Sequence, residues 1–161
     1  MCNSTSSSES NKPATSNSNT SGTTTTTATE EKLTMGISHV GLAVNKLDSS
    51  LAFFQALGFD KIGGVESYPS YFLSDGTTML TLWQTNEDAT PFDRRKNVGL
   101  HHLAIRVPSL EALQTAFDIV TKKVDGVDID FEPTELKGTP LHHAMVFEPS
   151  GNRIELTYHA S

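Results

Sequence analysis

The chain has 161 residues and a formal charge of −7, from 12 Lys and Arg against 19 Asp and Glu. This balance argues against a nucleic-acid or membrane-surface binding protein, because such surfaces need an excess of positive charge. Cys2 is the single cysteine, so an intramolecular disulfide framework is excluded. No apolar run approaches the roughly 18 residues that cross a bilayer. We expect a cytoplasmic protein, with organelle targeting by the N-terminal segment as the alternative.

The N-terminal segment has the composition of a disordered tail. Positions 1–29 hold 17 Ser or Thr and four Asn, with almost no apolar side chains. Such a segment buries too little surface to offset the entropy lost on ordering. It lacks the apolar stretch of a secretory signal and the arginines of a mitochondrial transit peptide. We therefore predict a disordered tail over 1–33 and a single folded domain over 34–161.

An internal repeat organises the folded part of the chain. The segment GISHVGLAV at 36–44 reappears as GLHHLAIRV at 99–107, with glycine, histidine and valine in register at an offset of 63 residues. The same offset brings Leu47 onto Leu110 and Phe54 onto Phe117. The repeat predicts two modules, over 36–84 and 99–159, joined by a linker at 85–98.

Hydrophobic periodicity predicts the same order of elements in both modules. In the first we expect a strand at 37–44, a helix at 47–57, and strands at 59–65, 69–74 and 78–84. In the second we expect a strand at 100–107, a helix at 110–124 capped by Ser109, and strands at 127–132, 141–147 and 153–159. A turn at 148–151 links the last two strands. Each module is thus a predicted βαβββ unit, and the fold class is α+β.

Strand alternation places a potential metal ligand opposite the helix-covered face in three of these strands. The three residues are His39, His102 and Glu155. Two imidazoles and one carboxylate leave coordination positions open on one divalent ion, Fe²⁺, Mn²⁺, Zn²⁺ or Ni²⁺. The alternative is that each histidine is a hydrogen-bonded core residue. The matched positions of His39 and His102 in the repeat favour the metal site.

Several motifs together resemble the vicinal oxygen chelate superfamily of glyoxalase I, bleomycin-resistance proteins, fosfomycin-resistance transferases and extradiol dioxygenases. They are the strand openings SHVGL at 38–42 and HHLA at 101–104, and the closing FEPSGNRIEL at 147–156. The resemblance implies two modules forming a curled mixed sheet around a central cavity, with metal ligands at His39, His102 and Glu155. The fourth ligand position of some members falls on Thr81. A homodimer, in which modules exchange partners, is common in this superfamily.

The threonine at position 81, where four-ligand members of the superfamily carry a metal ligand, helps to choose among the reactions. Threonine is a poor base and a poor ligand, which disfavours glyoxalase I proper. The transferases surround a phosphonate with cationic side chains, and residues 156–161 contain neither Lys nor Arg. We therefore favour a ring-cleaving, extradiol-type dioxygenase, with His143 as its acid–base group. The alternatives are a glyoxalase-like (lactoylglutathione lyase-type) lyase or isomerase, a metal-free bleomycin-resistance-like binding protein, and an inactive scaffold.

The remaining expectations concern the substrate pocket for a small molecule. Its predicted lining shares the strand phase of the ligands, and ordinary core packing is the alternative for each aromatic residue. Arg106 is either an anion contact or a strand-end charge, and Arg153 is expected on the hairpin surface. The run 94–96 is expected in a solvated loop, which leaves the metal as the main positive charge. The predicted lining residues are Thr81, Trp83, Arg106, Met145 and Phe147.

Overall fold

The computed structural model describes residues 33–160. The predicted tail up to residue 32 lies outside the described residues, and Leu33 at its end is exposed. Residues 36–160 belong to one compact unit. Within the described part of the chain, no helix is long and apolar enough to cross a membrane.

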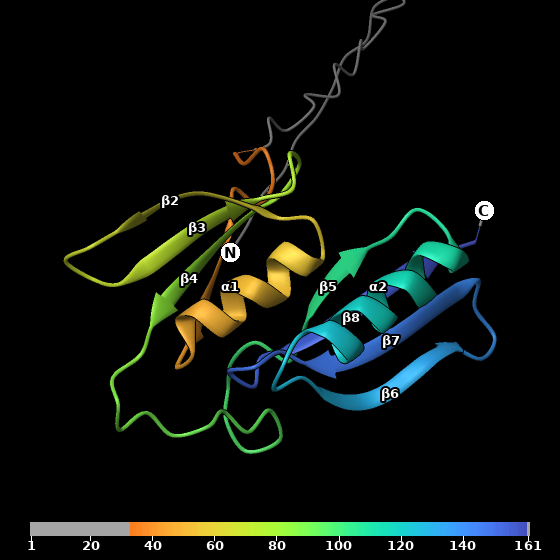
Figure 1. Cartoon of the computed structure of the whole chain (residues 1–161). Coiled ribbons are helices and arrows are strands. Elements are labelled where there is room, and N and C mark those ends of the chain that lie inside the picture. Colours follow the sequence, from red (N-terminus) through yellow and green to blue (C-terminus); the bar gives the residue numbers. More distant parts are fainter. Residues whose placement is uncertain (1–32, 161) are drawn as a thin grey trace, which may run out of the picture. The chain divides into compact units, whose positions relative to one another are not determined.

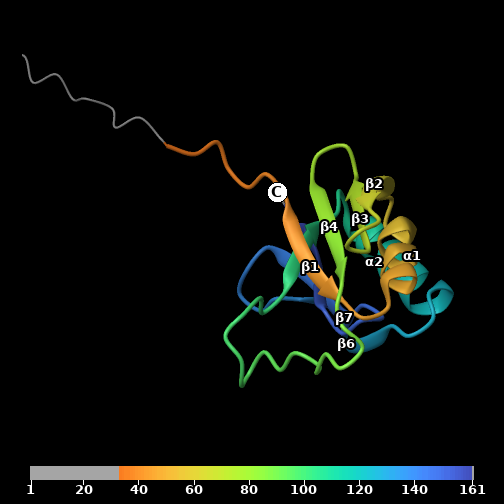
Figure 2. The same cartoon turned by 90° about the vertical axis from the view of Figure 1, so that its left-hand side faces the viewer.

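The first module is a four-stranded mixed sheet covered by one helix. Strands β1 and β4 are parallel, whereas β4, β3 and β2 follow one another antiparallel, in the order β1-β4-β3-β2 (Figure 1). The view in Figure 2 places β1 and β4 side by side. The elements are β1 (Val40–Val44), α1 (Leu47–Ala56), β2 (Asp60–Val65), β3 (Ser70–Ser74) and β4 (Met79–Gln84).

The second module repeats this arrangement. Its sheet has the order β5-β8-β7-β6, with β5 and β8 parallel and the other neighbours antiparallel. Both β5 and α2 begin 63 residues after their counterparts β1 and α1, as the repeat predicts. The predicted α+β fold of two βαβββ modules is therefore confirmed. The elements are β5 (Leu103–Arg106), α2 (Leu110–Lys123), β6 (Asp128–Glu135), β7 (Leu141–Phe147) and β8 (Arg153–His159).

The first strand of each module is shorter than its hydrophobic pattern suggests. β1 begins at Val40 and β5 at Leu103, so His39 and His102 each lie just before a strand. The first paired residues are Val40 with Leu80 of β4 and Leu103 with Ile154 of β8, so neither histidine has a partner in the sheet within residues 33–160. The helix boundaries agree with the pattern to within one residue, and the Ser109 side chain caps α2 by accepting a 3.0 Å hydrogen bond from the Ala112 N–H.

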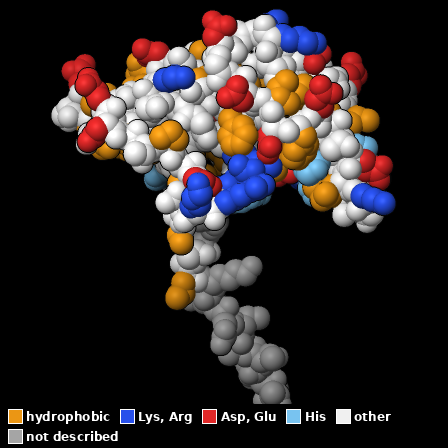
Figure 3. Space-filling view, turned by 90° about the horizontal axis from the view of Figure 1, so that it is seen from below, with side chains coloured by type: hydrophobic (Ala, Val, Ile, Leu, Met, Phe, Trp, Pro, Cys, Tyr) orange, Lys and Arg blue, Asp and Glu red, His pale blue; other side chains and the backbone are white. Residues whose placement is uncertain are grey.

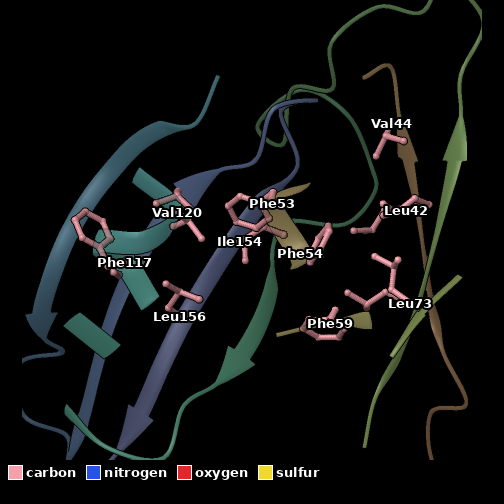
Figure 4. Close-up of a cluster of buried hydrophobic side chains, with 14 of the residues drawn as sticks. Leu42, Val44, Phe53, Phe54, Phe59, Leu73, Phe117, Val120, Ile154 and Leu156 are labelled. Atoms are coloured by element: carbon pink, nitrogen blue, oxygen red, sulfur yellow. The ribbon is translucent and has the colours of Figure 1, made fainter. Parts of the chain in front are cut away.

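One hydrophobic core is shared by the two modules. It contains buried side chains from both sheets and both helices, including Phe53 and Phe54 of α1 and Phe117 of α2. Figure 4 shows Phe53 between the side chains of the two sheets, close to Ile154 of β8. Each sheet therefore uses its helix-covered face to build the common core.

A buried polar cluster also joins the modules. The Glu148 carboxylate, 1% exposed, accepts a 2.6 Å hydrogen bond from the Ser50 hydroxyl of α1. It also accepts bonds from the backbone and side-chain N–H groups of Asn152, whose amide reaches across to the Ala43 carbonyl at 3.0 Å. The turn 148–151 is closed by the Gly151 N–H on the Glu148 carbonyl. This cluster ties the turn that leads into β8 to the first module.

The family resemblance implies a curled mixed sheet around a central cavity, and in this chain each module forms a mixed sheet of its own. These are two separate four-stranded sheets, and no strand pair joins them within residues 33–160. Because both helix-covered faces meet in the common core, the face opposite that core is turned outward in each sheet. Of the predicted ligands, Glu155 lies in a strand, whereas His39 and His102 lie just before β1 and β5.

Candidate metal centre

Glu155 lies at the centre of the outer face of the second sheet. Its neighbours across the sheet are Ala104 of β5 and Met145 of β7. The Oε2 atom lies 3.2 Å from Nε2 of His102, and Oε1 lies 2.7 Å from Nδ1 of His143. A carboxylate only accepts hydrogen bonds, so the His143 Nδ1–H donates to it. The structure thus brings together three of the residues that the sequence singled out for metal binding and proton transfer.

The His102 and Glu155 atoms are spaced like two ligands of one ion. Metal–nitrogen and metal–oxygen bonds of roughly 2.0–2.2 Å put neighbouring ligand atoms about 3.0–3.5 Å apart, and the observed separation is 3.2 Å. Imidazole and carboxylate are also the donor types that Fe²⁺, Mn²⁺ and Zn²⁺ accept. The glutamate side chain is largely buried, at 12% exposure, so its orientation is set by its two imidazole partners. This part of the face fits a divalent ion.

His101 supports His102 from the side away from Glu155. The two Nδ1 atoms lie 2.8 Å apart, and the rings meet edge to face. Desolvation and electrostatic repulsion from the neighbouring Arg153, His102 and Arg94 hold the pKa of His101 below its usual value. A neutral His101 can accept a hydrogen bond at Nδ1 from the Nδ1–H of His102, and such a bond fixes the orientation of a metal-binding imidazole. Sequence analysis missed this role, although the doubled histidine at 101–102 was visible.

His39 stands apart from this cluster. It is exposed and lies before β1, on the other module. Within residues 33–160, no group of three His, Cys, Asp or Glu side chains is arranged to hold a metal ion. The chain therefore assembles two of the three predicted ligands, and the third, His39, lies just before the first strand of the other module.

The outer face of the first sheet is aromatic. The indole N–H of Trp83 donates a 2.9 Å hydrogen bond to Thr81, which is 3% exposed. Phe72 and Tyr68 pack on the indole at centroid distances of 5.8 and 5.3 Å. A side chain at Gly41 would have its Cβ 3.3 Å from Thr81 Oγ1, so glycine leaves room for this pair. The Thr81 hydroxyl oxygen already accepts the hydrogen bond from Trp83. Aromatic side chains, which we call the aromatic wall, therefore surround the position that corresponds to Glu155.

Two arginines lie next to the cluster formed by Glu155, His102 and His143, called the Glu155 cluster below. Arg153 of β8 donates from Nε and a terminal nitrogen to Asp130 of β6, and Arg94 of the linker lies 3.8 Å from the same carboxylate oxygen. The Arg153 side chain is 11% exposed, so its predicted place on the hairpin surface is wrong. Its neighbour across the sheet is Phe147. The separation of Asp130 from Arg153 by 23 residues left no local signal for this pair.

The other predicted pocket residues are divided between different surfaces. Met145 is buried beside Glu155, and Phe147 is half-buried and borders a cavity of about 180 Å³ together with Arg94, His101 and Arg153. Arg106 is exposed and borders a different hollow, beside the start of α2. The Arg94–Lys96 run is likewise divided, because Arg94 is half-buried while Arg95 is exposed.

Comparison with known proteins connects this arrangement to a large group. A family model described as Glyoxalase/Bleomycin resistance protein/Dioxygenase superfamily matches residues 36–156. No curated protein matches the chain. Solved structures match over most of both chains, with sequence identities that carry information on the fold alone.

Three of these structures illustrate the range. A glyoxylase/bleomycin resistance protein/dioxygenase domain from Frankia sp. EAN1pec is 21% identical, with a TM-score of 0.66 over 78% of this chain and 98% of its own. A fosfomycin resistance protein, FosX, from Listeria monocytogenes, in complex with Mn(II) and 1S,2S-dihydroxypropylphosphonic acid, is 16% identical, with a TM-score of 0.63 over 80% and 95%. A lactoylglutathione lyase from Agrobacterium tumefaciens is 18% identical, with a TM-score of 0.58 over 78% and 94%.

Proposed function

Because the chain belongs to the Glyoxalase/Bleomycin resistance protein/Dioxygenase superfamily, we propose that it is a metal-dependent enzyme acting on a small oxygenated substrate. One observation carries this proposal: His102 Nε2 and Glu155 Oε2 are 3.2 Å apart on an outward-facing sheet. These two residues would hold the ion, and His101 would orient His102. The bound ion would supply Lewis-acid activation of substrate oxygens.

We propose that His39 of a second copy completes the ligand set. Within one chain the helix-covered faces are occupied by the common core, so the outer face that carries Glu155 and the exposed His39 before β1 are available to another molecule. Two copies related by a two-fold axis would bring the first sheet of each against the second sheet of the other. The aromatic wall around Trp83 would then face the Glu155 cluster and form one side of the substrate pocket, opposite Met145 and Phe147.

A ring-cleaving dioxygenase is the reaction that we favour. His143 bonds Glu155 through Nδ1 and packs edge to face on Phe131 at 4.9 Å, which leaves Nε2 available to hold or release a proton. A proton carrier next to the substrate is what such a reaction needs. A glyoxalase-like lyase is the second candidate. It is disfavoured because the Thr81 hydroxyl, engaged by Trp83, offers no strong base. A metal-free ligand-binding protein is the third.

Metal content is the first test. Purified full-length protein should contain close to one equivalent of Fe, Mn, Zn or Ni per chain by elemental analysis, and Glu155→Gln should lose most of it. Glu135→Gln on β6 is the matched control, because this exposed carboxylate lies on the same sheet and should retain the metal. If wild-type protein takes up none of these ions, the enzyme proposal fails and the metal-free binding protein replaces it.

The shared site has its own test, a complementation experiment. His39→Ala and Glu155→Ala variants should each lose metal, and a mixture that is unfolded and refolded together should regain about a quarter of the wild-type content, because half of the dimers are mixed and each mixed dimer has one intact site. A site contained within a single chain would show no recovery. Analytical ultracentrifugation of the wild type should show a dimer.

Oxygen uptake with a panel of catechols under Fe²⁺ tests the reaction. His143→Ala should slow turnover on the best substrate by about 10²-fold or more, as expected for loss of a general acid–base group, while the metal content is unchanged. An equally large loss of metal would make His143 a ligand instead. Absence of uptake across the panel, with metal present, would favour the lyase.

A further inference from the structure

The cavity beside the candidate metal centre has the features of an oxyanion site. Its volume of about 180 Å³ is enclosed by the linker, by the turn before β8 and by Arg153 at the start of β8. In another protein a cavity of roughly 150 Å³ is enough to hold benzene. Phe92 and Phe147 supply aromatic walls, and Arg94 lies 5.6 Å above the Phe147 ring.

The cations around this cavity outnumber the anions. Arg94 and Arg153 line the cavity with a single carboxylate, that of Asp93, in a chain whose total charge is −7, and Asp130, which pairs with Arg153, lies outside the lining. Asp93 is paired with Lys96 at 3.0 Å. Figure 3 shows Lys and Arg side chains gathered on the underside of the molecule, close to histidine and apolar side chains.

The guanidinium groups still have donors to offer. A guanidinium has five N–H donors in a fixed fork that matches a carboxylate or a phosphonate. Arg153 uses Nε and one terminal nitrogen on a single oxygen of Asp130. Arg94 approaches that oxygen only to 3.8 Å and makes no hydrogen bond within residues 33–160. Asp130 therefore holds both guanidinium groups in place, while several of their N–H donors stay available for a ligand.

The linker that carries Arg94 is held in place on both sides of that residue. Asp93 accepts a 2.9 Å hydrogen bond from the Arg95 N–H, and its carbonyl accepts one from the Asn97 N–H. Before Asp93, the Phe92 ring lies directly on Gly99, where an added Cβ would approach the ring to 2.7 Å. Arg94 and one wall of the cavity are thus presented by an ordered segment.

The cavity adjoins the candidate ligands. His101 borders it and contacts His102 through Nδ1 at 2.8 Å. Arg153 precedes Glu155 by two residues on the same face of β8, a separation of about 6.6 Å along a strand. One small molecule could therefore place oxygens near Glu155 while an anionic group enters the cavity.

We propose that Arg94 and Arg153 bind an oxyanion, a carboxylate or a phosphonate, and that this group belongs to the substrate. Phe92 and Phe147 enclose the carbon skeleton next to it. The assignment of the ligand as substrate rests on the proposed function, whereas the binding of the oxyanion needs no metal. The opposing interpretation is that the two arginines and Asp130 only fasten the linker to β6.

Titration of metal-free, full-length protein separates these interpretations. Benzoate and phenylphosphonate are the oxyanion probes, benzyl alcohol is the neutral control, and affinities are measured by isothermal calorimetry or by chemical shifts. We expect at least one oxyanion probe to bind about tenfold or more tightly than benzyl alcohol, since charge-assisted hydrogen bonds require the anion. Equal binding of all three, or no binding, would overturn the proposal.

Variants identify the groups responsible. Arg94→Gln should weaken oxyanion binding by about tenfold, whereas Arg95→Gln, the same charge change at the next, exposed residue, should have little effect. Asp130→Asn should tighten binding several-fold because it removes the competing carboxylate, whereas Asp118→Asn on α2 should not. Equal weakening by Arg94→Gln and Arg95→Gln would mean a diffuse charge effect and would contradict the site.

The outcomes also separate this inference from the proposed function. Metal content is measured on the same preparations. If the wild-type protein binds no metal but still binds the oxyanion through Arg94, only the proposal of a metal-dependent enzyme is contradicted. Normal metal binding without oxyanion binding would contradict only the assignment of Arg94 and Arg153.

Discussion

The two modules share one topology but differ on their outer faces. In the second, Glu155 is held between two imidazoles and flanked by two arginines. In the first, the corresponding position is Thr81, which accepts a hydrogen bond from Trp83 under a layer of aromatic rings. The outer face of the second sheet carries the charged groups and the candidate metal ligands, and that of the first sheet is lined by aromatic rings.

The helix-covered faces keep part of the repeated pattern. Phe54 and Phe117 occupy equivalent positions, and both are buried in the same core. A close-packed interior resists changes of volume, so residues that contribute to it are constrained in both copies. The outer faces have no such constraint within the chain. A duplicated unit can therefore keep one side for stability and change the other side for chemistry.

The largest expected effect tests whether the core is a single cooperative unit. Phe54→Ala and Phe117→Ala should each lower the free energy of unfolding by about 3–5 kcal/mol, because each leaves a large cavity. Both should shift one common transition in urea, followed by far-UV circular dichroism and by Trp83 fluorescence. If either variant separates these two signals into two transitions, the modules fold independently.

The next effect compares the turns that precede the last strand of each module. Glu148→Ala should cost about 2–3 kcal/mol, because it leaves the buried Ser50 and Asn152 groups without their acceptor. Asp75 lies in the corresponding turn of the first module and accepts only local bonds from Thr77 and Thr78, in an exposed position. Asp75→Ala should therefore cost clearly less in chemical denaturation. Equal losses would mean that Glu148 does not join the modules.

A smaller effect concerns the support of His102. His101→Ala should weaken metal binding by about tenfold or more, as is typical for loss of a partner that orients a metal ligand. His142→Ala, the equivalent change next to His143, is the control, since its ring packs near Tyr158 at 6.3 Å. Competition with a chromophoric chelator measures both affinities. Equal affinities for wild type and His101→Ala would remove His101 from the site.

The smallest effect is the pH dependence that arises at Asp75. Desolvation raises its pKa, but hydrogen bonds from the Thr78 and Thr77 backbone and the Thr77 hydroxyl outweigh it and hold the pKa below the usual 3.8. A carboxyl whose pKa is lower in the folded state stabilises that state at a pH above its pKa in the unfolded chain. This stabilisation is lost as the pH falls through the pKa of the folded state. The stability difference between wild type and Asp75→Asn should therefore shrink below pH 3.8 in thermal scans. A constant difference would contradict this origin.

Much of the fold could be predicted from local patterns. The offset of 63 residues and the hydrophobic periodicity predicted the order of the strands and helices and the phase of Glu155, whereas β1 and β5 begin three residues later, and β6 ends three residues later, than predicted. Such patterns report which side of an element is apolar, and this depends only on neighbours along the chain. The resemblance to the superfamily rests on the motifs at 38–42, 101–104 and 147–156, and the family is confirmed.

Contacts between distant segments could not be predicted in this way. The pairing of Arg153 with Asp130 and the approach of Arg94 depend on how the linker and β6 lie against β8. The same holds for the direction in which the two outer faces point, which is set by the common core.

The sequence by itself therefore determined the repeated βαβββ unit and the presence of two imidazoles and a carboxylate in matching phases, because strand and helix periods are local properties. Only the tertiary structure decided that His102 and Glu155 meet while His39 stands apart. It also decided that two arginines, which the sequence assigned to solvent, border a cavity beside them. The physical reason is that packing and charge pairing act between residues far apart in the chain, where periodicity carries no information.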